Sequence, residues 1–291
     1  MKKRAFLFVI LASIFWGTSG LFVHALSPLG FTSAQMTFAR GIVSFLCIAV
    51  YLLIRDRSAM KAGLIDLLLY GLVGISLFGT GYFYFSSIQL SSVSTAVILM
   101  YTAPIFVMAF SVLFLGEKLT WKKTVAVVAM LIGCCLVAGV IGGFRFHPLG
   151  ILFGLLSGIS YATYNVVTKI ALKRGGKPIT ATFYGFLAMS LVALIFCDLP
   201  DMVGHAVAAP WPSVPLLIAL GVITYVIPYT LYTIAMNTLE AGTAATLGIV
   251  EPMAATLFSF AFLGEQLGIF SMIGIVLILF AVFFLGYAEK N

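Results

Sequence analysis

Ten long apolar runs fill this chain of 291 residues. Each run has about 20 residues, the length that an α-helix needs to cross the hydrocarbon core of a bilayer. Only 9% of the residues are charged, whereas a soluble domain has about 25%. The sequence therefore predicts an all-α polytopic membrane protein. It argues against a soluble enzyme, a disordered tail and a nucleic-acid-binding domain, even with a formal net charge of +7.

The apolar runs predict ten transmembrane helices. The first run follows a basic N-terminus and could imitate a signal peptide, but we interpret it as a membrane helix because it matches a later segment of the chain. The longest loop, near residues 198–212, has only about a dozen residues and is too short for a soluble domain. The predicted spans are residues 5–25, 32–54, 63–86, 92–115, 121–141, 148–171, 178–197, 213–236, 242–263 and 267–287.

The basic residues predict how the spans face. Loops on the cytoplasmic side of membrane proteins are enriched in Lys and Arg. With the N-terminus inside, thirteen of the Lys and Arg residues fall in cytoplasmic segments, and only Arg145 falls in an outer loop. The other two, Arg40 and Lys169, lie within spans. We therefore expect both termini in the cytoplasm, which agrees with an even number of spans.

The two halves of the chain resemble each other. A shift of 148 residues aligns Tyr101-Thr-Ala-Pro104 with Ile249-Val-Glu-Pro252, and Leu115-Gly-Glu117 with Leu263-Gly-Glu265. Each copy has five spans, and an odd number makes the second copy enter the membrane from the opposite side. Transporters with inverted repeats place the substrate site near the midplane, where the halves meet.

The boundaries of the two predicted repeats are residues 1–144 and 145–291, which together form one transmembrane unit. Several short motifs, some of which have a counterpart in the other half, carry a family resemblance. They are Phe15-Trp16-Gly17, Phe38-Ala-Arg40, Ala103-Pro104, Leu115-Gly-Glu117, Glu251-Pro252 and Leu263-Gly-Glu265.

These motifs, in this order, resemble the drug/metabolite transporter superfamily, and within it the EamA-type ten-helix transporters. The resemblance covers essentially the whole chain. It implies export of small metabolites, often amino acids, across a bacterial inner membrane, with the fifth and tenth spans serving mainly as scaffold. It implies no particular substrate.

Two charged residues within the spans are the first candidates for a binding site, because charges in hydrocarbon are costly. Arg40 lies about eight residues, or about 12 Å, from the outer end of its span. Glu251 lies near the midplane of span 242–263 and is followed by Pro252, which removes a backbone donor. We predict that Arg40 anchors a carboxylate and that Glu251 meets an amine or a proton. The alternatives are a structural pair, or two separate hydrogen-bonded groups that hold helices together.

Aromatic and hydroxyl side chains at similar depths are the second set of candidates. A tyrosine deep in a span needs a partner for its hydroxyl, and such a set suits an amphipathic or aromatic ligand. Interfacial anchoring and helix packing are the alternatives for some of them. The predicted substrate-binding residues, besides Arg40 and Glu251, are Trp16, Thr18, Tyr82, Tyr84, Tyr101, Tyr161, Tyr164, Asn165 and Tyr229, and the same belt includes Thr102, Tyr225 and Tyr232.

Other features predict structural roles. Glycines at every fourth position from Gly150 to Gly158 allow another helix to approach closely. Glu117 and Glu265 lie in tight turns, where helix capping or loop pairing is expected. Lys169, near the cytoplasmic end of its span, is expected to extend its amine to the membrane surface.

No motif for catalysis or cofactor binding is present. The chain lacks a Walker loop, an HExxH motif and a Gly-x-Ser-x-Gly elbow. The four cysteines lie in apolar runs, and neither they nor the three histidines have a metal-ligand spacing. We predict no enzyme activity and no cofactor.

We therefore expect a secondary transporter or exporter of small organic metabolites, with amino acids as the favoured substrates, working by alternating access. The expected partners are a small-molecule substrate and the lipid bilayer, and protons or a second copy in a homodimer remain open. The alternatives are an exporter of aromatic cations or drugs, and an uncoupled facilitator. Relatives with four helices carry an acid in their first helix, whereas span 5–25 has none, so any proton coupling would depend on Glu251.

Overall fold

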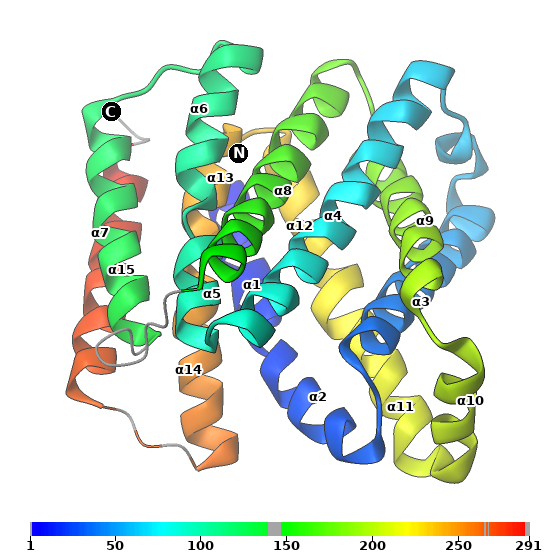
Figure 1. Ribbon diagram of the computed structural model, residues 1–291. Coiled ribbons are helices and arrows are strands. Elements are labelled where there is room, and N and C mark those ends of the chain that lie inside the picture. The colour runs from blue at the N-terminus through cyan, green and yellow to red at the C-terminus, as the bar shows by residue number, and fades with distance from the viewer. Residues whose placement is uncertain (1, 139–146, 265, 267, 289–291) are drawn as a thin grey trace.

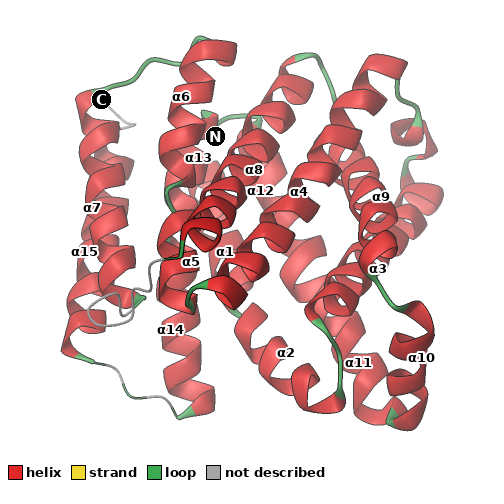
Figure 2. Ribbon diagram, viewed as in Figure 1, coloured by secondary structure: helices red, strands yellow, loops and turns green. Residues whose placement is uncertain are grey.

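The computed structural model describes residues 2–138, 147–264, 266 and 268–288. Within these residues the chain is helical and forms no strand (Figure 2). The first half contains α1 (Lys2–Gly17), α2 (Ser19–Leu26), the 3₁₀ turn η1 (Ser27–Leu29), α3 (Ser33–Arg55), the 3₁₀ turn η2 (Arg57–Met60), α4 (Leu64–Leu90), α5 (Val93–Met100), α6 (Ala103–Leu115) and α7 (Trp121–Val137). The second half contains α8 (Pro148–Lys173), α9 (Pro178–Phe196), α10 (Leu199–Ala208), α11 (Pro210–Gly221), the π-helical turn η3 (Val222–Val226), α12 (Ile227–Met236), α13 (Ala241–Gly248), α14 (Val250–Leu263) and α15 (Ile269–Ala288).

The all-α polytopic fold predicted from the apolar runs is confirmed. Nine helical segments of the described residues are long and apolar enough to cross a membrane. The remaining predicted span, 121–141, corresponds to α7 with its 17 residues, and residues 139–141 lie outside the described part of the chain. Helix α1 begins and α15 ends at the same end of the molecule (Figure 1), as an even number of crossings requires.

The two halves interleave instead of lying side by side as separate bundles. Helix α1 packs against α12, α4 against α8, α3 against α9, and α7 against α15, so each of these pairs takes one helix from each half. Small residues allow the close approach. A Cβ on Gly274 of α15 would lie 2.6 Å from the carbonyl oxygen of Gly133 of α7. The predicted glycine ladder of α8 works in the same way, because a Cβ on Gly154 would lie 2.6 Å from Cβ of Leu99.

The predicted spans 92–115 and 242–263 are each broken in the middle, and the second break lies where the missing backbone donor of Pro252 indicated irregular backbone. The first break separates α5 from α6 at Tyr101 and Thr102, and the second separates α13 from α14 at Ile249. Pro104 and Pro252 follow the breaks, and proline cannot donate a backbone hydrogen bond to the preceding turn. The two breaks occupy equivalent positions of the repeats. Broken helices of this kind mark the binding site in many transporters.

Three further segments differ from the predicted continuous spans and loop. Span 5–25 breaks between α1 and α2, where the Thr18 hydroxyl donates to the Phe15 carbonyl at 2.7 Å. Span 213–236 contains the π-helical turn η3, just before Pro228. The loop near 198–212 contains α10, whose first turn is capped by Asp198 through a bond from the Asp201 amide. Asp and Pro at the start of a helix are an ordinary N-terminal signal.

Candidate substrate site

Aromatic side chains of three helices meet inside the bundle. The Trp16 ring of α1 lies 5.0 Å from the Tyr229 ring and 5.2 Å from the Tyr232 ring, both on α12. Tyr164 of α8 lies 5.6 Å from Tyr229 and 6.3 Å from Tyr232. All four side chains are buried. We call Trp16, Tyr164, Tyr229 and Tyr232 the aromatic cluster, and it joins α1 of the first half to α8 and α12 of the second.

A buried amide fixes the orientation of this cluster. Asn165 of α8 is fully buried. Its side-chain oxygen accepts a hydrogen bond from the Tyr232 hydroxyl at 2.5 Å, and its amide nitrogen donates to the Tyr161 carbonyl at 2.8 Å. The Tyr161 and Tyr164 rings lie 6.0 Å apart, because residues three apart share a helix face.

Glu251 lies beside the second helix break, in the first turn of α14. The positive end of the helix dipole favours a carboxylate at this position. The Glu251 side chain is half-buried, and its carboxylate interacts with the Tyr101 hydroxyl, which comes from the first break. Tyr84 of α4 is also within electrostatic range. Side chains from both helix breaks therefore lie close together around Glu251.

Tyr161 connects this place to the aromatic cluster. A Cβ on Gly248, the last residue of α13, would lie 3.2 Å from the Tyr161 hydroxyl oxygen. The same hydroxyl lies within electrostatic range of Glu251. Only glycine at position 248 leaves this approach unobstructed.

Arg40 of α3 is held by two neighbours. Its guanidinium lies over the Tyr225 ring, 4.9 Å from the ring centroid, and its Nη2 donates to the Thr37 hydroxyl at 2.9 Å. Tyr225 lies in the π-helical turn η3, and such turns are frequent at functional sites. Arg40 and Glu251 interact electrostatically, but no direct ion pair joins these two described residues. The structural-pair alternative therefore has no direct contact to support it.

Two predicted site residues lie apart from the others. Tyr82 is 42% exposed and packs on Phe78 and Phe196, so it faces outward from the bundle. The Thr18 hydroxyl bonds to its own helix at the α1–α2 break. The remaining predicted residues lie in the aromatic cluster, next to Glu251, or at Arg40.

Unpartnered polar atoms gather around the site. Within the described part of the chain, most buried side-chain polar atoms without a hydrogen-bond partner belong to residues near it. They include Nε1 of Trp16, Nε of Arg40 and the hydroxyls of Tyr164, Thr168 and Thr233. Burying such a group without a partner costs about 1–3 kcal/mol. All of them can donate a hydrogen bond, so the site is built to receive an acceptor group.

Thr168 and Thr233 were not predicted from the sequence. Thr168 is four residues after Tyr164, and Thr233 is four residues after Tyr229. Residues four apart share a helix face, so this spacing was the available signal. Tyr225 belongs to the predicted belt, but its contact with Arg40 depends on the π-helical turn and has no sequence signature.

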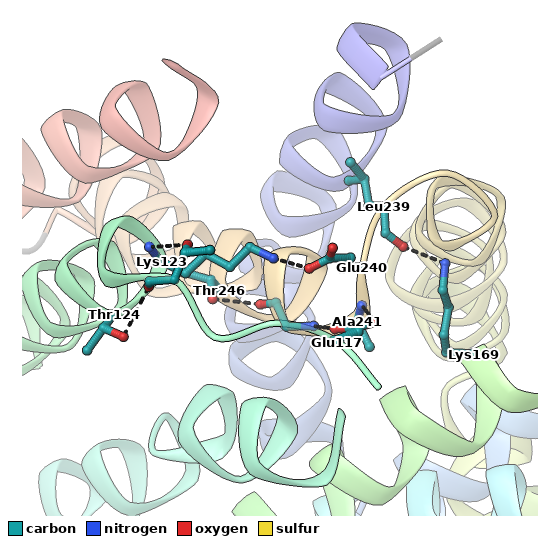
Figure 3. A network of polar contacts seen from close by, with 10 residues as sticks. Glu117, Lys123, Thr124, Lys169, Leu239, Glu240, Ala241 and Thr246 are labelled. Carbon is teal, nitrogen blue, oxygen red and sulfur yellow. Dashed lines mark hydrogen bonds and ion pairs between the residues drawn. The ribbon is translucent and has the colours of Figure 1, made fainter. Parts of the chain in front are cut away.

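A charged network closes one end of the molecule, where α1 begins and α15 ends (Figures 1 and 3). Lys123 of α7 forms an ion pair with Glu240, which precedes α13. The Glu117 carboxylate accepts bonds from the backbone amides of Ala241 at 2.9 Å and Gly242 at 3.4 Å. It therefore caps α13, as expected for an acid in this turn. Its repeat counterpart Glu265 lies outside the described residues.

Lys169 belongs to the same network, which corrects the expectation that its amine reaches the membrane surface. The residue is only 7% exposed. Its Nζ donates to the carbonyls of Met236 at 2.5 Å and Leu239 at 2.6 Å (Figure 3). A cation at the end of α12 satisfies carbonyls that have no intrahelical donor.

Two more ion pairs lie at this end and also join the halves. Arg174 pairs with Asp66 at 3.3 Å, and Lys177 pairs with Asp56 at 2.8 Å. The hydrogen bond from Lys177 lowers the pKa of the Asp56 carboxyl to about 2. We call the end that carries these pairs and the Lys123–Glu240 pair the latched end.

No group of three or more His, Cys, Asp or Glu that could hold a metal ion occurs among the described residues.

The fold defines a multi-pass membrane protein, with a candidate site of polar and aromatic side chains where its two halves meet.

The chain belongs to the EamA-like transporter family, whose family model matches residues 3–139 and 148–287. The two matched segments correspond to the two halves described above. The resemblance found in the sequence motifs is thereby confirmed.

Relatives cover nearly the whole chain. An uncharacterized transporter of Archaeoglobus fulgidus is 32% identical over 274 residues, which cover 94% of this chain and 93% of the relative. The threonine/homoserine exporter RhtA of Escherichia coli is 28% identical over 271 residues, covering 90% of this chain and 83% of that protein. A solved crystal structure with 20% sequence identity superposes with a TM-score of 0.78, covering 100% of this chain and 99% of that one. The last likeness concerns the fold.

Proposed function

We propose that this transporter exports small amino acids by alternating access. The observation that carries the proposal is the separation of Arg40 from Glu251. A basic and an acidic side chain lie within electrostatic range of each other without a direct ion pair, and Trp16 and Tyr164 of the aromatic cluster carry unpartnered donors. A zwitterion presents the complementary charges.

In this proposal the substrate carboxylate meets Arg40 and the ammonium group meets Glu251. The side chain occupies the space next to the aromatic cluster. Tyr225 and Thr37 hold the guanidinium, so little conformational entropy is lost when a carboxylate binds.

The interleaved halves and the two broken helices support alternating access. The two helix breaks provide backbone groups without intrahelical partners next to Glu251, as in other transporters with broken helices. We place the latched end on the cytoplasmic side of a bacterial inner membrane, because the basic loops lie at this end of the molecule and such loops are typically cytoplasmic. The name of RhtA, a threonine/homoserine exporter, supports the substrate class.

Protons are the candidate coupling ion, with Glu251 as the group that would carry them. An uncoupled facilitator is the second mechanism. A transporter of aromatic cations is the second substrate class, which the tyrosines near Glu251 favour and Arg40 disfavours.

The experiment is counterflow in liposomes that contain the purified protein, with labelled amino acids and labelled aromatic cations. The wild type is expected to exchange amino acids. The variant Arg40→Ala should lose this exchange by about tenfold or more, since a charge-assisted hydrogen bond contributes about 1.5–3 kcal/mol. Arg57→Ala, outside the site, is the control. Exchange of cations alone, or full amino-acid exchange by Arg40→Ala, would contradict the proposal.

A further inference from the structure

A small pocket lies next to the aromatic cluster, between α4, α8, α9 and α12. It shares the walls formed by Tyr164 and Tyr229 with the cluster. Thr168 and Thr233 lie one helical turn beyond these tyrosines, toward the latched end. The pocket has room for one water-sized group, and not for a whole amino acid.

Three hydroxyl groups of this pocket lack hydrogen-bond partners. They belong to Tyr164, Thr168 and Thr233, which are 2%, 1% and 1% exposed. The hydroxyls of Tyr164 and Thr233 lie near each other but do not form a bond of acceptable geometry. A fourth hydroxyl, that of Thr182, is already bonded to the carbonyls of Pro178 and Ile179 at 3.1 and 3.0 Å.

The rest of the lining is apolar and includes Val73, Leu77 and Phe186. A pocket of this kind matches one particular chemical group. A hydroxyl can donate one hydrogen bond and accept others, as three unpaired hydroxyls require. A methyl group would fit the same space but would leave all three unpaired.

No acidic side chain lines the pocket, so the pocket offers no charge for a cation. Lys169, the residue after Thr168, already donates to two backbone carbonyls. Its amine is therefore not available to bind an anion in the pocket. The chemistry of the lining therefore favours a neutral polar group.

We propose that this pocket is a specificity subsite that receives the hydroxyl of the transported substrate, so that the preferred substrates are hydroxylated small amino acids. The inference rests on the proposed function, because it takes an amino acid as the substrate. The unpaired hydroxyls of Thr168 and Thr233 select the substrate hydroxyl, and the apolar walls offer it no other polar partner.

The test measures counterflow in liposomes with pairs of substrates that differ only by a hydroxyl in place of a methyl group. The pairs are L-threonine with L-valine, and L-homoserine with L-norvaline. The wild type should prefer the hydroxylated member of a pair by about tenfold or more. Thr168→Val and Thr233→Val keep the side-chain shape but remove the hydroxyl, and each should lower this ratio about tenfold, mainly through the KM of the hydroxylated substrate.

Two controls keep the test independent of folding. Thr182→Val removes a hydroxyl of the same pocket that already has partners, and it should leave the ratio unchanged. Thr168→Ser and Thr233→Ser retain the hydroxyl and should retain the ratio.

The outcomes separate the two proposals. Amino-acid exchange by the wild type without preference for a hydroxyl would overturn the subsite and leave the proposed function standing. A lower thermal stability of Thr168→Val and Thr233→Val with an unchanged ratio would assign the pocket to a structural water, which also overturns the subsite. Absence of any amino-acid exchange would overturn both proposals.

Discussion

Glu251 combines three properties that a coupling residue needs. It lies at a helix N-terminus, it is half-buried, and its partner Tyr101 comes from the other half of the molecule. A carboxylate that lies near a side chain of the other repeat can change its environment when the repeats move. Arg40, by contrast, is held by Thr37 and by Tyr225, so it is suited to a fixed anchoring role.

Substitution of Glu251 separates coupling from binding. In Glu251→Gln the amide keeps the size of the side chain but carries no charge and cannot take up or release a proton. If the transporter is proton-coupled, exchange in counterflow should persist, with KM raised about 10- to 100-fold by the loss of a charge-assisted bond. Acceleration by a pH gradient should disappear. Measurements of both in the same liposomes check this, with Glu240→Gln at the latched end as the control. Gradient-driven transport by Glu251→Gln would remove the coupling role.

The sequence predicted the residue types of the candidate site and, from their spacing, that Tyr161 and Tyr164 share a helix face, but not which side chains of different helices would meet. Trp16, Tyr164 and Asn165 were predicted from their depth in the spans, since buried polar and aromatic groups are unusual in hydrocarbon. Depth does not determine the direction of a side chain around the helix. Tyr82 has a suitable depth but faces outward, and Thr168 was overlooked because a threonine in a span is ordinary.

The breaks at Tyr101 and Ile249 show how far the sequence predicts whole helices. The sequence predicted spans well, because bilayer thickness sets their length and apolar composition reveals it. Pro252 indicated irregular backbone next to Glu251, but the sequence did not predict the first break or that either helix would end, because the segments on both sides are equally apolar and a proline can kink a helix without ending it. Pro104 and Pro252 at equivalent positions of the repeats were the available signal.

Restoring the missing donor tests whether the second break is functional. In Pro252→Ala the new amide can bond to the Gly248 carbonyl four residues earlier. The helix should become more continuous, with the free energy of unfolding unchanged or raised by up to about 1 kcal/mol. The maximal transport rate should fall severalfold. Counterflow kinetics and thermal unfolding of one preparation measure both effects.

Pro178→Ala is the matched control for this variant. Pro178 is the first residue of α9, where the amide would have no helical partner in any case. Both properties should therefore change little in Pro178→Ala. An equal loss of rate in the two proline variants would mean that the break at Ile249 has no special role.

At the scale of the whole molecule, charged side chains join the two halves at one end. The pairs Lys123–Glu240, Arg174–Asp66 and Lys177–Asp56 each take one residue from each half. If the protein works by alternating access, the two halves must separate at the latched end. The folded-state pKa of Asp56 is lowered to about 2. The contribution of the Lys177–Asp56 pair to stability is therefore fully present above the ordinary pKa of an aspartate, and it is lost only as the pH falls toward 2. Neutral pH changes should therefore leave this pair intact, whereas salt should weaken it.

Removal of one latch pair should shift the molecule toward opening at this end. The Lys123 side chain is only 14% exposed, so Glu240→Gln is expected to favour opening by about 1 kcal/mol, or about fivefold in the ratio of open to closed forms. Ser111 lies beside this pair and is buried. A cysteine introduced there, in a background without the four native cysteines, should react with a maleimide about fivefold faster when Glu240→Gln is present.

Two further variants are the controls. Asp66→Asn removes a more exposed pair and should have a smaller effect, because water screens that pair. The double variant Lys123→Glu with Glu240→Lys should restore slow labelling, since it reverses the pair without losing it. If labelling stays slow in Glu240→Gln, or if the double variant labels as fast as the single one, the Lys123–Glu240 pair does not hold the halves together. The other contacts between the halves at this end, the Arg174–Asp66 and Lys177–Asp56 pairs and the bonds of Glu117 to the α13 amides, then hold them instead.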